Sequence, residues 1–124
     1  MHLLARIASA PQQRLFDALA RCGELFLAVG PHGITANFAG TLRIRRHGLE
    51  DMLDVDDGKS HVHVDWSRLK RAEAEVRGAE GLLTFYDGTE PLFRVYRQAG
   101  PYPAEVARLA EATLWPSEPD VAAT

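Results

Sequence analysis

Cysteine, lysine and long hydrophobic runs are all scarce in this sequence of 124 residues. The single cysteine, Cys22, excludes a disulfide scaffold, a cysteine-rich zinc site and a covalent C-x-x-C-H haem attachment. No stretch approaches the roughly 20 consecutive apolar residues that a membrane-spanning helix needs. The segment Met1–Ala10 also lacks the charged start and apolar middle of a signal peptide. We therefore expect a cytoplasmic protein that does not insert into a membrane.

The usual sequence signatures of enzymes are absent as well. The chain contains no G-x-S-x-G, P-loop, G-x-G-x-x-G or H-E-x-x-H motif. Its formal net charge of −3 argues against a general nucleic-acid binder, which usually carries excess positive charge. These absences favour a binding protein over an enzyme and exclude no single ligand.

The composition indicates one folded domain. Hydrophobic residues make up 46% of the chain and charged residues 25%, which is enough apolar surface to form a core. Residues 116–124 combine prolines, acids and small side chains. We therefore expect a single domain over residues 1–115 and a flexible tail over 116–124.

The positive charge consists of twelve arginines and only two lysines, Lys59 and Lys70. A coding bias toward arginine accounts for this ratio. The functional alternative is that several guanidinium groups bind carboxylates or phosphates through their planar pair of donors.

Hydrophobic periodicity predicts a helix at each end of the chain and strands between them. The expected helices are Pro11–Cys22 and Pro103–Trp115. The expected strands are Leu25–Val29, Ile34–Phe38, Thr41–His47, Leu49–Val55, His61–Trp66, Leu82–Tyr86 and Pro91–Arg97. For Leu49–Val55 the apolar spacing also allows a helical turn in place of a strand with a bulge. The last two strands flank Asp87-Gly88, a pair typical of tight hairpin turns. This order predicts an α+β fold.

The segment Ser67–Arg77 is ambiguous from its residues. Its charged and alanine-rich composition favours a helix. Its small and apolar residues nevertheless alternate with charged ones, which is the two-residue period of a strand.

The motif His61-Val62-His63 contains the most informative candidate residues. On a strand, residues two apart point to the same side, so both imidazoles would align with Asp65. Three interpretations remain open: a solvated polar face, an H-x-H metal site, or a haem-iron ligand with the other imidazole nearby. Among the other histidines, His32 opens a strand after a turn and His47 is expected to face solvent.

The order of several motifs resembles a known bacterial family. The motifs are Asn37-Phe38-Ala39-Gly40-Thr41-Leu42, Arg46-His47-Gly48, His61-Val62-His63-Val64-Asp65 and the aromatic hairpin from Leu83 to Tyr96. Together they resemble the haem-utilisation carrier family, HutX/ChuX-like, which is related to one half of HemS-like proteins. The resemblance covers about Leu25–Trp115.

The resemblance implies a large antiparallel sheet flanked by N- and C-terminal helices, with a strand over Leu69–Val76. It also implies a homodimer that handles haem in the cytoplasm. His61 matches a haem-associated histidine of the family, so it is the expected iron ligand, with His63 and His32 secondary.

Haem also needs an apolar slot and cations for its two propionates. Residues available for the slot include Phe38 and Tyr96, and residues available for the propionates include Arg45 and Arg94. We therefore expect a non-covalent haem carrier or buffer in haem uptake, iron acquisition and utilisation. The alternatives are a protein-interaction module of the same fold that has lost haem, or a haem-degrading enzyme.

Overall fold

The computed structural model describes residues 6–30 and 33–112. It has two α-helices, one 3-10 helix and eight strands within those residues. In chain order these are α1 (Ala10–Ala20), β1 (Leu25–Val29), β2 (Ala36–Gly40), β3 (Leu42–His47), β4 (Glu50–Val55), β5 (Ser60–His63), the 3-10 helix η2 (Trp66–Arg68), β6 (Arg71–Arg77), β7 (Glu80–Asp87), β8 (Glu90–Arg97) and α2 (Ala104–Glu111). The predicted α+β class, with helices flanking an antiparallel sheet, is confirmed.

The strands form two antiparallel sheets. The larger sheet has five strands in the order β2-β1-β8-β7-β6, and the smaller sheet has three in the order β3-β4-β5. The predicted hairpin is confirmed, because β7 and β8 pair from Asp87↔Glu90 inward with Gly88 and Thr89 in the turn. The ambiguous segment is also settled, because β6 is a strand that pairs with β7.

Helix α1 begins with a capping box. The hydroxyl of Ser9 accepts a hydrogen bond from the Gln12 backbone N–H, and the Gln12 side chain accepts one from the Ser9 N–H. Pro11 occupies the first turn, where its missing N–H costs nothing. The helix ends at Ala20, close to the predicted limit.

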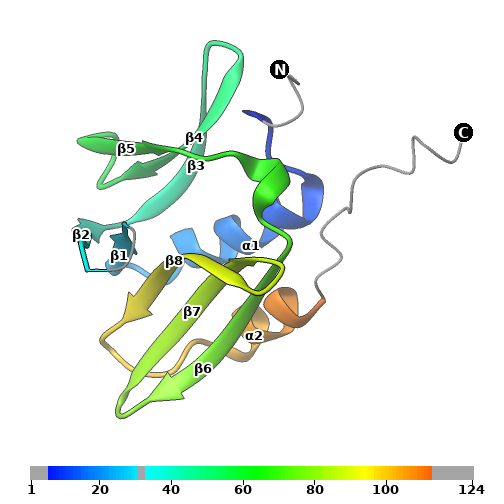
Figure 1. Cartoon of the computed structure of the whole chain (residues 1–124). Helices are drawn as coiled ribbons and strands as arrows, with labels where there is room; N and C mark the ends of the chain where they lie inside the picture. The colour runs from blue at the N-terminus through cyan, green and yellow to red at the C-terminus, as the bar shows by residue number, and fades with distance from the viewer. Residues whose placement is uncertain (1–5, 31–32, 113–124) are drawn as a thin grey trace, which may run out of the picture.

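The core lies between the two sheets, and α1 fills it. Leu15, Phe16 and Leu19 of α1 are almost completely buried. The ring of Phe16 stacks on Phe85 of the larger sheet and meets Trp66 of η2 edge-on, with ring centroids 5.3 and 5.6 Å apart. Figure 1 shows α1 between β3, β4 and β5 on one side and the larger sheet on the other. Both sheets therefore turn one face to α1 and the other face outward.

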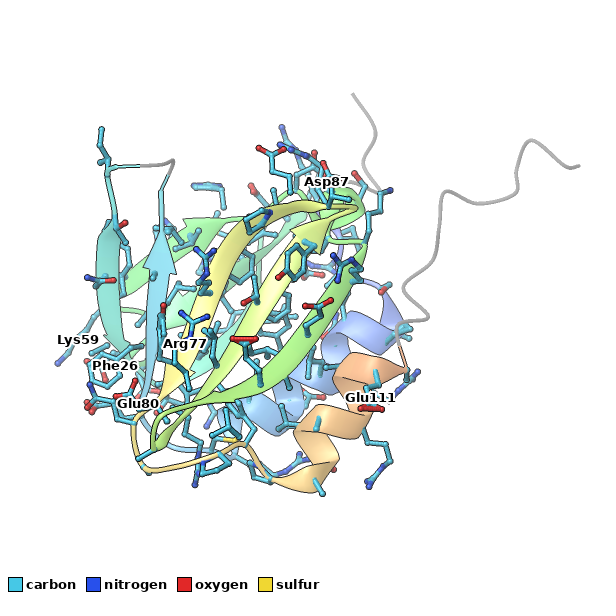
Figure 2. The ribbon with its side chains drawn as sticks, turned by 60° about the horizontal axis from the view of Figure 1, so that its bottom comes forward. Phe26, Lys59, Arg77, Glu80, Asp87 and Glu111 are labelled. Atoms are coloured by element: carbon cyan, nitrogen blue, oxygen red, sulfur yellow. The ribbon has the colours of Figure 1, made fainter. Side chains whose placement is uncertain are left out.

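No helix formed by residues 6–30 or 33–112 covers the outer face of the larger sheet. Figure 2 shows this face with Arg77 and Glu80 at one end of β6 and β7 and Asp87 at the other end of β7. Charged pairs cover it, including Arg71 with Glu73 and Arg77 with Glu75. The Arg71 guanidinium also lies 3.9 Å from the centre of the Tyr86 ring.

Asp51 links the smaller sheet to the N-terminal segment. Its buried carboxylate accepts hydrogen bonds from the Ala8 N–H at 2.9 Å and from Arg46 Nε at 2.6 Å. Its backbone carbonyl accepts a bond from the Trp66 indole N–H at 2.8 Å. Gln12 completes the link by donating from Nε2 to the carbonyls of Trp66 and Leu69.

The predicted strand His61–Trp66 is too long. Strand β5 ends at His63, because the carbonyl of Asp51 binds the Trp66 indole where the next ladder position would be. Asp65 caps η2 by accepting from the Ser67 N–H, so it does not continue the row of His61 and His63.

Two other predicted limits also shift. The strand expected over Ile34–Phe38 begins instead at Ala36, because its partner β1 ends at Val29 and pairs that residue with Ala36. The final helix is Ala104–Glu111; the remainder of the predicted Pro103–Trp115 helix, from Thr113, and the expected tail over 116–124 lie outside the described residues.

We predict that Gln12→Leu lowers the free energy of unfolding by about 2 kcal/mol, because the buried Leu69 carbonyl loses its hydrogen-bond donor. Urea unfolding followed by circular dichroism measures the change. Gln13→Leu is the matched control, since no hydrogen bond of the Gln13 side chain holds the core together. An equal loss in both variants would contradict a specific role for Gln12.

Candidate functional site

The three-stranded sheet presents one polar face to the outside. Because side chains alternate along a strand, the residues that share rows with His61 and His63 all point away from the core. The intervening residues, such as Leu42, Leu53 and Val55, are buried. We call the outward set the histidine face: Arg43, Arg45, His47, Glu50, Met52, Asp54, His61 and His63.

The histidine face is concave along β3 and β4. His47 stands opposite Glu50 in the ladder, four residues from Asp54. Four residues of extended strand span about 13 Å. His47 Nε2 nevertheless lies 3.0 Å from Asp54 Oδ1. The ribbon must therefore bend toward this face, which brings side chains from its two ends together.

This bend gathers three imidazoles. The ring centroids of His47 and His61 are 5.8 Å apart, and those of His61 and His63 are 5.6 Å apart. His61 is exposed and stands between the other two rings. Within residues 6–30 and 33–112, the His61 ring makes no hydrogen bond. Its nitrogens are therefore available to a ligand.

Carboxylates hold the two outer histidines. His63 Nδ1 lies 2.9 Å from Glu50 Oε2, and His47 Nε2 is bound to Asp54. Asp54 is almost fully buried at 3% exposure and also pairs with Arg45, whose Nε lies 3.4 Å from Oδ2. Arg43 stands in the same row as Asp54 and His61 and forms no ion pair with any described residue.

The other predicted site residues lie elsewhere. Arg94 and Tyr96 are on β8, on the outer face of the larger sheet, where Tyr96 stands in a row with Phe26 and Leu82. Phe38 on β2 packs against the core. The core thus separates Arg94 and Tyr96 from the histidine face, and Phe38 belongs to the packing of the core. His32 lies outside the described residues.

Sequence reasoning missed three participants. His47 was expected simply to face solvent, whereas the bend of the ribbon places its ring beside His61. Glu50 and Asp54 were not singled out, although each holds a histidine. The signal was the β3–β4 hairpin itself, because its register puts all three residues on the face of the H-x-H motif.

One further observation concerns the metal-site alternative for the H-x-H motif, and another concerns membrane-spanning helices. Among the residues that the structure describes, no three histidine, cysteine, aspartate or glutamate side chains form a group that could hold a metal ion. In the same residues, no helix has both the length and the apolar character to cross a membrane.

Arg46 and Cys22 have shifted pKa values. The hydrogen bond from Arg46 to Asp51 raises the pKa of that guanidinium. Burial raises the pKa of the Cys22 thiol, against the opposing charge of Arg97. A raised pKa leaves less thiolate at neutral pH, so Cys22 does not have the features of an activated nucleophile.

Comparison with known proteins depends on structure alone. No protein-family model matches the sequence, and no curated protein matches it by sequence. A crystal structure of a protein from Erwinia carotovora matches with a TM-score of 0.58 at 17% identity, over 81% of this chain and 70% of that one. Two structures of ChuX match at 12% identity. One has a TM-score of 0.53 over 80% of this chain and 67% of its own; the other, described as the heme binding protein ChuX, has 0.56 over 86% and 72%.

The chain has the ChuX-like fold. At 12–17% identity, this likeness establishes the architecture. It agrees with the fold that the ordered sequence motifs imply.

We predict that Asp54→Asn lowers the free energy of unfolding by about 1–2 kcal/mol, because a buried acceptor shared by His47 and Arg45 is lost. Asp57→Asn is the control, since Asp57 is exposed in the following turn. Urea unfolding of the two variants gives the comparison. Equal stability of both would show that the buried carboxylate contributes little.

Proposed function

We propose that this protein binds haem non-covalently on the histidine face and acts as a haem carrier or buffer. In this proposal a histidine of β5 is the iron ligand, and Arg43 and Arg45 bind the propionates. The sequence resemblance and the ChuX-like fold support haem as the ligand. The observation that carries the proposal is the gathering of three imidazoles on one exposed face, with the central one unbonded within residues 6–30 and 33–112.

The donors on this face suit haem. An imidazole nitrogen is the commonest protein ligand of haem iron. Arg43 and His61 share a row with Asp54 between them, which places their backbones two strand spacings apart, or about 10 Å. That separation lets a guanidinium reach the propionate edge of a haem whose iron is bound on β5. Met52 lies between the histidine and arginine strands and supplies an apolar surface.

Haem would supply an iron atom that an imidazole nitrogen can ligate. The chain's own residues do the rest. A histidine of β5 would ligate the iron, the arginines would neutralise the propionates, and the sheet would keep these side chains at their spacing. A surface of this kind suits binding and transfer, because the ligand remains accessible to a partner.

The resemblance adds two expectations to the proposal. A haem-utilisation carrier of this family would be a homodimer and would work in the bacterial cytoplasm. Light scattering of the purified chain with and without hemin tests the first expectation.

Hemin titration followed by absorbance tests the proposed function. We expect a saturable Soret shift at about one equivalent. The double variant His61→Ala/His63→Ala should weaken the affinity at least tenfold, because both ligands of β5 are removed. The matched double variant Arg94→Ala/Tyr96→Phe, on the larger sheet, should change it less than twofold.

Other results would overturn the proposal in distinct ways. No saturable shift in the native protein would remove haem as the ligand. A loss only in the Arg94 and Tyr96 variant would move the site to the larger sheet. Bleaching of the bound haem when a reductant is added would show a haem-degrading enzyme instead of a carrier.

A further inference from the structure

The three histidines of the histidine face differ in what holds each ring. His47 faces a carboxylate through Nε2, His63 faces one through Nδ1, and His61 has no hydrogen bond to any residue the structure describes. An ionised carboxylate can only accept hydrogen bonds. The nitrogen that faces the carboxylate therefore carries the hydrogen, and the other nitrogen of a neutral ring carries the lone pair.

This rule separates the candidates for iron ligation. In neutral His63 the hydrogen is on Nδ1 and the lone pair is on Nε2, at the tip of a side chain that is 64% exposed. In neutral His47 the lone pair is on Nδ1, next to its own backbone, where a large planar ligand has the least room. For His61 nothing described fixes the ring or its tautomer. Of the three histidines, only His63 has both a ring held by a hydrogen bond and a lone pair that a ligand can reach.

Glu50 is well placed to hold that ring. Its side chain is only 18% exposed, so its charge is less screened than that of a surface glutamate. Its sole ion-pair partner among residues 6–30 and 33–112 is His63. His63 on β5 stands opposite Met52 on β4. Glu50 lies two residues before Met52 on β4, so its side chain is on the same face as that of His63.

We propose that His63 is the iron ligand and that Glu50 is its positioning residue. This inference depends on the proposed haem-binding function. A carboxylate that accepts the second ring N–H orients a ligating histidine and makes it a stronger donor. A stronger donor stabilises the higher oxidation state of iron, so Glu50 favours ferric over ferrous haem.

The test uses the full chain loaded with hemin and the variants Glu50→Gln, Glu50→Asp, His63→Ala and His61→Ala. The readouts are hemin affinity, the ferric/ferrous midpoint potential and the iron–histidine stretching band in resonance Raman spectra of the ferrous form. Glu75→Gln is the control, because Glu75 lies on the larger sheet and pairs with Arg77. Urea unfolding shows that each variant is folded.

We expect Glu50→Gln to bind hemin within about threefold of the native affinity, with a more positive potential and a lower stretching frequency. The potential and the stretching frequency of Glu50→Asp should lie between those of the native protein and those of Glu50→Gln. His63→Ala should lose at least tenfold in affinity and lose the band, and Glu75→Gln should change none of the three readouts. A merely structural role of Glu50 would move the unfolding midpoint without moving the potential.

Failure of this inference differs from failure of the proposed function. If the native protein does not bind hemin, the function itself is wrong. If hemin binds but His61→Ala removes the band and Glu50→Gln leaves the potential unchanged, His61 is the ligand and the inference is overturned. A shifted potential in Asp54→Asn, and none in Glu50→Gln, would assign the ligand to His47.

Discussion

The buried carboxylate of Asp51 is the constraint on which the arrangement of the smaller sheet depends. It satisfies the backbone of Ala8 and the guanidinium of Arg46, while the carbonyl of the same residue binds the indole of Trp66. A buried charge left without partners is strongly destabilising, so these contacts must form together with the fold. One residue of β4 thereby fixes the N-terminal segment, β3 and η2 relative to one another.

The inward position of Asp51 also decides what faces outward. Side chains alternate along a strand, and a slip of one residue would exchange the two faces of β4. With Asp51 directed toward the core, its neighbours Glu50 and Met52 must lie on the histidine face. The outward positions of Glu50, which contacts His63, and of Met52 therefore follow from the buried contacts of Asp51. One of these contacts holds the indole of Trp66, and Gln12 of α1 donates to the carbonyl of the same residue. Fold and candidate site are not independent features of this chain.

Local sequence patterns predicted most of the elements, because each leaves a short-range signal. The capping and periodicity of α1 and the Asp87-Gly88 hairpin are of this kind. The early end of β5 was not predictable, because it depends on a hydrogen bond from the Trp66 indole to the Asp51 carbonyl of β4, which alternation does not encode. The division of the strands into two sheets was not predicted either. At the site, the H-x-H motif placed His61 and His63 correctly on one face, whereas the contribution of His47 depends on curvature, which no local pattern specifies.

The common core of the two sheets has a thermodynamic consequence. Phe16 stacks on Phe85 of the larger sheet and contacts Trp66 of η2, whose indole is hydrogen-bonded to Asp51 of the smaller sheet. Loss of packing in one sheet therefore also disturbs the packing of the other. Binding energy gained on one outer face is then shared by the whole chain as resistance to unfolding. A ligand at a hundred times its Kd adds about 2.7 kcal/mol to a protein that binds it only when folded. In the proposed function, a bound ligand would therefore prolong the lifetime of the folded domain, and the unloaded form would unfold first.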